Sequence, residues 1–389
     1  MISFDNSAIN LNTEMDKILL QICTQIQITK TQRTLAETAY HCLGSFLSGS
    51  SCPLSNYKPS IYSQGSFKIQ TTNRPMGQEE FDLDFVCELK SPLASLVGPD
   101  HLLSQLYDCI KKNPDFSQTV EIKKRCVRMI YPKEFHIDII PAIPDLNNGG
   151  TCILVPDREL HKWTESNPIG YADWFESNAV PNQTYERRSI EQLPNQEPVA
   201  YKKILKVIVQ LLKRARDVAF SGNKFNGDHA PASIVLTTLA TEQFHQGENS
   251  INQGILKILS GILFNINNTQ PDTLRVLNPT NPNELFSEQW EKNPESYRQF
   301  TVWIETFIQE WSGLLQLRGL PKIHHALSLL FGEDVTRVAI SDIAEHASDN
   351  FRDNKLGILP SLGLVKNTTH PDVIPFKPNT FYGDNFINS

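Results

Sequence analysis

The stretch that decides the fold is residues 62–89, YSQGSFKIQTTNRPMGQEEFDLDFVCEL. In its last nine residues apolar and acidic side chains alternate, which is typical of a strand with one buried face. Asp82 and Asp84 fall on the other face, where successive same-side residues lie about 7 Å apart. Two carboxylates held that close repel each other unless a cation lies between them. The alternation predicts either a carboxylate pair that binds a cation or a plain polar outer face.

A third acid lies in another short alternating stretch, HIDII at 136–140. Its isoleucines share one face of the expected strand and Asp138 lies on the other. If the two strands are neighbours, Asp138 joins Asp82 and Asp84 on one surface. Oxygen ligands of this kind suit Mg²⁺, with Mn²⁺ as a substitute. Three acids and two such ions form the frame for in-line nucleotidyl transfer.

A small-residue turn, Gln64-Gly65-Ser66, precedes the acidic pair by 15 intervening residues. Glycine lets the backbone approach a ligand closely, and the amides and the serine hydroxyl can donate to phosphate oxygens. A Gly-Ser pair alone indicates only a turn. Upstream of an Asp-x-Asp strand, it indicates a phosphate site.

Together, Gly65-Ser66, Asp82-Leu83-Asp84 and Asp138 resemble the signature of the polymerase-beta-like nucleotidyltransferases. The fuller string at 62–89 is similar to that of the bacterial CD-NTases, the cyclic-oligonucleotide synthases of CBASS antiphage signalling. These enzymes are related to cyclic GMP-AMP synthase and oligoadenylate synthase. The resemblance extends over roughly residues 11–350 and is weakest in the C-terminal tail.

The resemblance implies an enzyme that makes a cyclic di- or trinucleotide second messenger from ribonucleoside triphosphates, ATP and/or GTP. It implies that Asp82, Asp84 and Asp138 bind two Mg²⁺ ions while an acceptor hydroxyl attacks the α-phosphate and pyrophosphate leaves. Asp138 is the candidate to assist deprotonation of the acceptor. A downstream effector protein is the expected partner, reached through the diffusing cyclic product.

The second half offers further nucleotide contacts. Lys213, in QLLKRARD, resembles a triphosphate-contacting lysine of the family, and Ser233, in PASIVLTTL, matches the start of the next family helix. Ser233 has a helix cap as its alternative role. Lys202 and Lys206 lie close to Lys213 on the helical wheel, and a solvated basic face is the favoured interpretation for these two.

The expected architecture is α+β and bilobal, with a mixed-sheet nucleotidyltransferase core and an α-helical C-terminal lobe like that of oligoadenylate synthase. Residues 1–190 would hold N-terminal bracing helices and the core, 191–365 the helical lobe, and 366–389 an irregular tail. A linker is expected at 181–198, where prolines fall among polar residues. Helical patterns cover 11–50, 99–112, 201–217, 232–244, 250–264, 284–292, 295–315 and 340–349.

The charge balance separates the candidate functions. The chain has 389 residues with 36 Lys+Arg and 43 Asp+Glu, a formal charge of −7. A net acidic chain argues against a broad electrostatic surface for DNA or RNA. Two alternatives to a cyclic-nucleotide synthase remain. The acidic charge disfavours the first of them, an enzyme that adds nucleotides to RNA or protein without a template. A catalytically silent nucleotide-sensing scaffold is the second alternative, and the three intact aspartates argue against it.

Two short segments allow two interpretations each. Lys123-Lys124-Arg125 with Arg128 would either help to hold an anion or form an exposed strand, and the strand is favoured. Tyr171 and Trp174 would either stack on a base or pack in the core, and core packing is favoured.

The cysteines bear on the cellular compartment. All seven lie in the first 152 residues among apolar positions and without a Cys-x-x-Cys pair, which is typical of reduced structural cysteines. No basic-then-apolar leader opens the sequence, and no run of about 18–20 apolar residues occurs. These features predict a protein of a reducing cytoplasm, and the family resemblance implies that the cytoplasm is bacterial.

Overall fold

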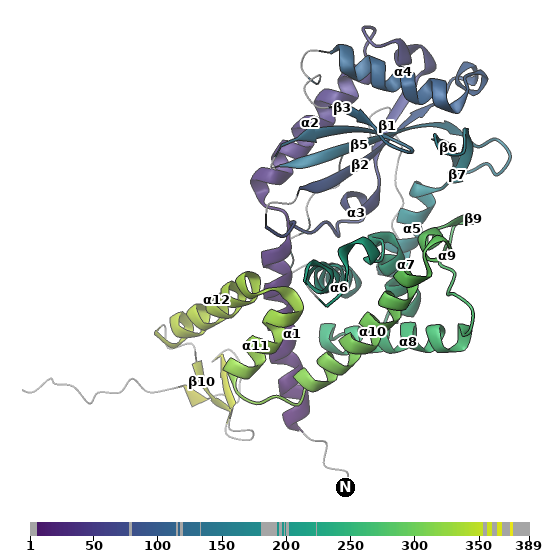
Figure 1. Ribbon diagram of the computed structural model, residues 1–389. Helices are drawn as coiled ribbons and strands as arrows, with labels where there is room; N and C mark the ends of the chain where they lie inside the picture. Colours follow the sequence, from purple (N-terminus) through teal and green to yellow (C-terminus); the bar gives the residue numbers. More distant parts are fainter. Residues whose placement is uncertain are drawn as a thin grey trace, which may run out of the picture.

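The computed structural model describes residues 6–77, 80–113, 116, 120–132, 134–179, 193, 197, 199, 202–222, 224–352, 356–359, 364–367 and 374–375. Figure 1 shows a sheet-based lobe packed on a helical lobe, with helix α1 (Asn6–Ile26) running from the helical lobe to the sheet. The predicted linker at 181–198 lies outside the described residues, except for positions 193 and 197. Within the predicted tail, the structure describes only residues 366–367 and 374–375.

The first lobe is built on a seven-stranded mixed sheet. Its main path runs β1-β2-β5-β4-β3, and β6 and β7 extend from β5. Strands β2 and β5 are parallel, whereas the other neighbours are antiparallel. The strands are β1 (Pro59–Ser63), β2 (Phe81–Leu89), β3 (Val120–Ile122), β4 (Val127–Tyr131), β5 (Phe135–Pro144), β6 (Ile153–Asp157) and β7 (Lys162–Ser166).

One face of this sheet is apolar because of the alternation in β2. Leu83, Phe85 and Cys87 are fully buried, and the Phe85 ring lies 4.7 Å from that of Tyr40. This face is covered by α2 and α4 (Figure 1), which leaves the acidic face of β2 towards the helical lobe. The elements of this lobe besides the strands are α2 (Lys30–Ser48), η1 (Pro53–Tyr57), α3 (Gly65–Lys68), η2 (Pro92–Leu96) and α4 (Pro99–Lys112).

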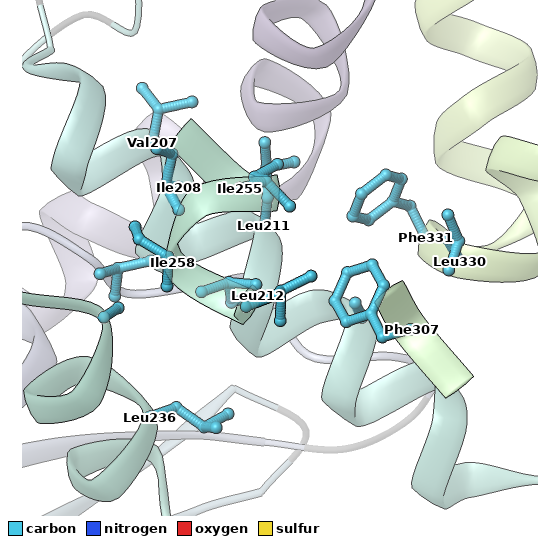
Figure 2. Close-up of a cluster of buried hydrophobic side chains, with 14 of the residues drawn as sticks. Val207, Ile208, Leu211, Leu212, Leu236, Ile255, Ile258, Phe307, Leu330 and Phe331 are labelled. Carbon is cyan, nitrogen blue, oxygen red and sulfur yellow. The ribbon is translucent and has the colours of Figure 1, made fainter. Parts of the chain in front are cut away.

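The second lobe packs its helices around α6, which is buried without a break from Leu205 to Ala215. Figure 2 shows α6 side chains meeting those of α7, α8, α10 and α11. The N-terminal helix α1 contributes to this same core. The elements are α1 (Asn6–Ile26), α5 (Pro168–Ala179), α6 (Ile204–Ser221), η4 (Gly227–His229), α7 (Ser233–Gln243), α8 (Ile251–Thr269), α9 (Glu288–Lys292), α10 (Pro294–Leu314), α11 (Leu320–Phe331) and α12 (Glu333–Arg352).

Short strands complete the chain, and one of them corrects the sequence interpretation. The segment 284–292 was predicted to be helical, but β9 (Asn281–Leu285) pairs with β8 (Leu277–Asn278), and the helix begins only at Glu288. The two prolines in NPTNPN favour a turn and an extended chain there. A separate three-stranded sheet is formed by β10 (Leu356–Leu359), β11 (Leu364–Asn367) and β12 (Ile374–Pro375). Within the described residues, no helix is long and apolar enough to span a bilayer.

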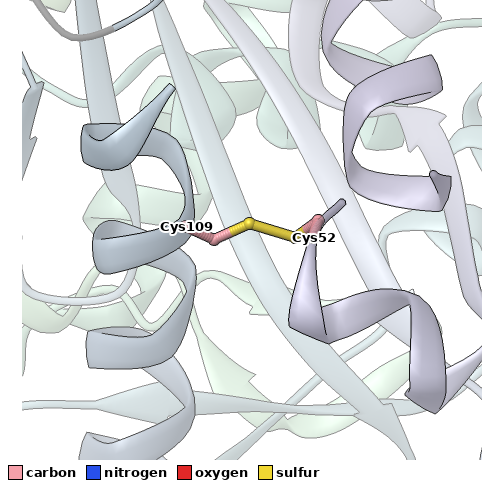
Figure 3. The surroundings of a disulfide bond; sticks show 2 residues. All are labelled: Cys52 and Cys109. Carbon is pink, nitrogen blue, oxygen red and sulfur yellow. A yellow bond between two sulfur atoms is a disulfide. The ribbon is translucent and has the colours of Figure 1, made fainter. Parts of the chain in front are cut away.

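The expectation that all cysteines are reduced is wrong for two of them. Cys52, just before η1, forms a disulfide with Cys109 of α4 (Figure 3), while the other five are free. The two cysteines are 57 positions apart in sequence, and connectivity across such a distance cannot be deduced from spacing. The bond ties the segment before β1 to the helix that covers the sheet.

We expect reduction of this disulfide to lower the free energy of unfolding by about 4 kcal/mol, because the unfolded chain regains the entropy of an open loop of this length. Urea denaturation with and without a reductant measures the change. Cys42→Ser, at an exposed free cysteine, should behave as the wild type does. The double variant Cys52→Ala/Cys109→Ala should not respond to reductant, and a wild type that is equally indifferent would contradict the prediction.

Candidate active site

The three aspartates lie together on the polar face of the sheet. Because β2 and β5 are adjacent and parallel, Asp84 stands directly opposite Asp138, and Asp82 stands opposite His136. Burial raises the pKa of Asp84 to about 7, and the charges of Asp138 and Asp82 add to the effect. The arrangement concentrates negative charge at one point, as the sequence predicted.

A cation from the neighbouring strand lies among these acids. Arg128 of β4 is paired in register with Asp138, and its Nε and Nη2 each donate to that carboxylate at 2.7 Å. Its Nη2 also lies 3.3 Å from Oδ1 of Asp82. Among the described residues, no three acidic, histidine or cysteine side chains are grouped closely enough to chelate one ion.

The favoured interpretation of an exposed basic strand is therefore wrong for Arg128, whose side chain is only 25% exposed. Lys123, in contrast, is exposed and pairs with Glu121. Lys124 and Arg125 pair with the buried Asp157. Arg128 differs because the alternation of β4 turns it to the face that carries the aspartates.

The Gly-Ser turn begins the short helix α3 beside the acidic pair. The Gln64 amide donates to the Asp84 carbonyl at 2.8 Å, and Gly65 has a φ of +60°. A Cβ atom at Gly65 would lie 2.6 Å from Oδ2 of Asp84, so only glycine fits this approach. The Ser66 hydroxyl lies 3.1 Å from that of Thr72.

A cavity of about 410 Å³ opens between the two lobes at this point. From the sheet lobe it is lined by Gly65, Ser66, Asp82 and Asp84, and from the helical lobe by Lys213 and Ser233. Six of the eight predicted site residues therefore share one cavity. Gln64 and Asp138 do not line it, but both are bound to the strand position of Asp84, Gln64 by a backbone hydrogen bond and Asp138 by strand register.

Lys213 and Ser233 reach the cavity from two helices. Lys213 Nζ donates to the Thr71 carbonyl at 2.9 Å, and burial, with the nearby charge of Arg216, lowers its pKa to about 8. Ser233 begins α7, and its hydroxyl oxygen accepts a hydrogen bond from Arg216 at 3.1 Å. Arg216 also lines the cavity and was missed from the sequence, although it stands one helical turn after Lys213.

A segment that follows the Gly-Ser turn, residues 70–73, is bound along α6 and to Lys202 just before it; we call this segment the strap. Lys202, Lys213 and Gln210 donate in turn to the carbonyl oxygens of residues 70, 71 and 72, at 2.8, 2.9 and 3.0 Å. Asn73 returns a hydrogen bond to the Gln210 carbonyl at 2.9 Å. The strap thus joins the Gly-Ser turn of the sheet lobe to α6, the central helix of the helical lobe.

The solvated basic face favoured for α6 is wrong. Lys206 is 1% exposed and pairs with Glu176 and Glu197, and Lys202 is bound to the strap. Lys206 is thus covered by acidic side chains of α5 and of position 197, whereas Lys202, just before α6, is covered by the strap.

Tyr171 and Trp174 pack as expected. Tyr171 is buried, its hydroxyl lies 3.1 Å from that of Thr238, and its ring contacts Trp174 and Phe286. Tyr171 also lines the cavity, in keeping with the less favoured interpretation that it stacks on a base.

Comparison with known proteins places this geometry in a family. Residues 14–178 match the model of the Second Messenger Oligonucleotide or Dinucleotide Synthetase domain. The chain is 32% identical to a c-di-GMP synthase of Roseivirga ehrenbergii over 96% of this chain and 99% of that protein. It is 26% identical to the cyclic dinucleotide synthase CdnG of Bradyrhizobium diazoefficiens, over 74% of this chain and 72% of that protein.

Solved structures agree on the fold. The Bradyrhizobium diazoefficiens CD-NTase CdnG, in complex with GTP, superimposes with a TM-score of 0.69 at 20% identity, over 85% of this chain and 99% of that one. The Vibrio cholerae cyclic AMP-GMP synthase DncV gives a TM-score of 0.53 at 16% identity, over 85% of this chain and 92% of that one. The predicted core with its mixed sheet and helical lobe is confirmed. The chain belongs to the bacterial CD-NTases, the nucleotidyltransferases that make cyclic oligonucleotide second messengers from nucleoside triphosphates.

Proposed function

We propose that this enzyme joins two GTP molecules into cyclic di-GMP. The observation that carries the proposal is the 32% identity to a c-di-GMP synthase over 99% of that relative's length. The CdnG structure that shares the fold was determined with GTP. The choice of base goes beyond the sequence reasoning, which left it open.

Asp82, Asp84 and Asp138 are the proposed ligands of two Mg²⁺ ions, for which Mn²⁺ would substitute. The donor chemistry fits a hard cation, because these are carboxylate oxygens on adjacent strands, but among the described residues the three side chains are not grouped closely enough to chelate a single ion. When bound, such ions lower the pKa of an attacking hydroxyl and offset charge on the phosphates. Asp138, opposite Asp84, is the proposed acceptor of the hydroxyl proton.

The remaining side chains of the cavity are proposed to bind the triphosphate. Ser66 and the neighbouring amides line one wall, and Lys213 and Ser233 line the other. The Ser233 oxygen already accepts a hydrogen bond from Arg216, so its hydroxyl proton is left to donate to a phosphate oxygen. Gln64 would act through its backbone by holding Asp84 beside the turn.

The test is incubation of the full chain with Mg²⁺ and each α-labelled ribonucleotide, alone and in all pairs, followed by phosphatase. We expect GTP alone to give a phosphatase-resistant product that co-migrates with cyclic di-GMP. A product that requires ATP would replace the assigned substrate. Linear ladders or labelled macromolecules would support template-free transfer, and a chain that binds GTP without consuming it would support the sensing scaffold.

We also propose that the product is an antiphage signal, made in the bacterial cytoplasm and read by a separate effector protein. The family membership supports this role. Cells that carry the chain with its neighbouring genes should resist phage, and cells with the Asp84→Asn variant should not.

A further inference from the structure

The guanidinium of Arg128 occupies the space between two of the proposed metal ligands. It donates to both oxygens of Asp138 at 2.7 Å and approaches Asp82 at 3.3 Å. It reaches them from β4, where pairing with β5 places it opposite Asp138. The contact is thus set by strand register rather than by a flexible loop.

This two-pronged contact engages the same oxygens that a divalent ion would need. An arginine fork satisfies a carboxylate in its own plane and leaves few lone pairs for another cation. The guanidinium also stays charged at every working pH, so protonation cannot relieve the competition. A divalent ion that binds Asp138 therefore meets fewer free lone pairs and the repulsion of the guanidinium charge, so metal and arginine compete for this carboxylate.

The same contact has a second effect. Without a counter-ion, three neighbouring carboxylates would repel each other and move apart. Arg128 offsets that repulsion and keeps Asp138 and Asp82 in place while no metal is bound.

We propose that Arg128 is a positioning residue that holds Asp138 and Asp82 in the metal-free enzyme and competes with divalent metal for these carboxylates. The inference rests on the metal site of the proposed function. Binding of metal is then an exchange of one cation for another. Mg²⁺ or Mn²⁺ binds weakly as long as the guanidinium of Arg128 stays on the carboxylates.

The test is direct Mn²⁺ binding to the full chain without nucleotide, measured by the electron paramagnetic resonance of free Mn²⁺. Arg128→Met should bind Mn²⁺ about tenfold more tightly than the wild type or better, because a charge in direct contact shifts such equilibria by roughly one to three log units. Lys123→Met is the matched control, since it removes one positive charge from the neighbouring segment at an exposed side chain. It should stay within about twofold of the wild type.

Two further variants locate the effect. Arg128→Lys keeps the charge and loses the fork, so it should bind Mn²⁺ with an affinity between those of the wild type and Arg128→Met. It also serves as the test if Arg128→Met does not fold. Adding Asp138→Asn to the methionine variant should abolish the gain.

Unchanged or weaker Mn²⁺ binding in both Arg128 variants would overturn the proposal. So would an equal gain in Lys123→Met, which would indicate a general charge effect, or a gain that survives Asp138→Asn. These outcomes do not depend on any product being formed. Failure of this inference is therefore distinct from failure of the proposed function, which is decided by the nucleotide assay.

Discussion

Asp84→Asn should reduce formation of cyclic product on the order of 10³-fold, the scale on which a single electrostatic group contributes in an active site. The amide keeps the shape of the side chain and loses the charge that is proposed to bind metal. In the wild type, Oδ2 of Asp84 lies beside Gly65, and Asp84 is paired with Asp138 across the two strands. Initial rates with labelled GTP and Mg²⁺ measure the effect.

The same substitution should not destabilise the protein, which separates lost chemistry from lost folding. Because the pKa of Asp84 is raised to about 7 in the folded state, its ionisation opposes folding as pH rises above the unfolded pKa near 3.8. At pH 8 in a chelator the Asn variant should therefore melt at the same temperature as the wild type or higher. Asp108→Asn, on the exposed side of α4, should leave both rate and melting unchanged. Retained activity in Asp84→Asn would refute the assigned role.

Gly65→Ala should lower the rate about 10²-fold, since displacements of about 1 Å in an active site have effects of that size. The added methyl would lie 2.6 Å from Oδ2 of Asp84, so either the turn or the carboxylate must move. The positive φ adds backbone strain. Initial rates and thermal melting should be measured together.

The control for this variant is Gly149→Ala. Gly149 has a φ of +63°, close to that of Gly65, but nothing lies within 4 Å of the added methyl. It should share the loss of stability, on the order of 1 kcal/mol, and keep its activity. Equal activities in the two variants would show that the approach to Asp84 has no catalytic consequence.

Local patterns in the sequence were sufficient for the central strand and its acids. The alternation of FDLDFVCEL predicted β2 with its bounds, and 99–112 predicted α4. What no local pattern contains is strand register. Asp84 lies opposite Asp138 because β2 pairs with β5, a strand about 50 residues further along the chain. Arg128 lies opposite Asp138 on its other side because β4 folds back and pairs with β5.

Helical periodicity also does not show which other segments of the chain cover the polar side of a helix. The helical wheel over residues 201–217 correctly separated the apolar side of α6 from Lys202 and Lys206. It could not reveal what covers these lysines: Lys202 is bound to the strap, 132 positions away in sequence, and Lys206 pairs with Glu176 of α5 and with Glu197. The disulfide could not be predicted for the same reason, since no local pattern around Cys52 indicates that Cys109, 57 positions away, is its partner.

The strap also limits how this enzyme can move. To hinge the lobes apart along α6, five hydrogen bonds between the strap and residues 202–213 would have to break, each with a net value of about 1 kcal/mol and with a higher cost where polar groups stay buried. The turn at Ser66 and the lysine at position 213 would then keep their spacing throughout a catalytic cycle. Nucleotides would enter and leave by the open side of the cavity, and a linear intermediate would have to reverse its direction inside walls that do not part.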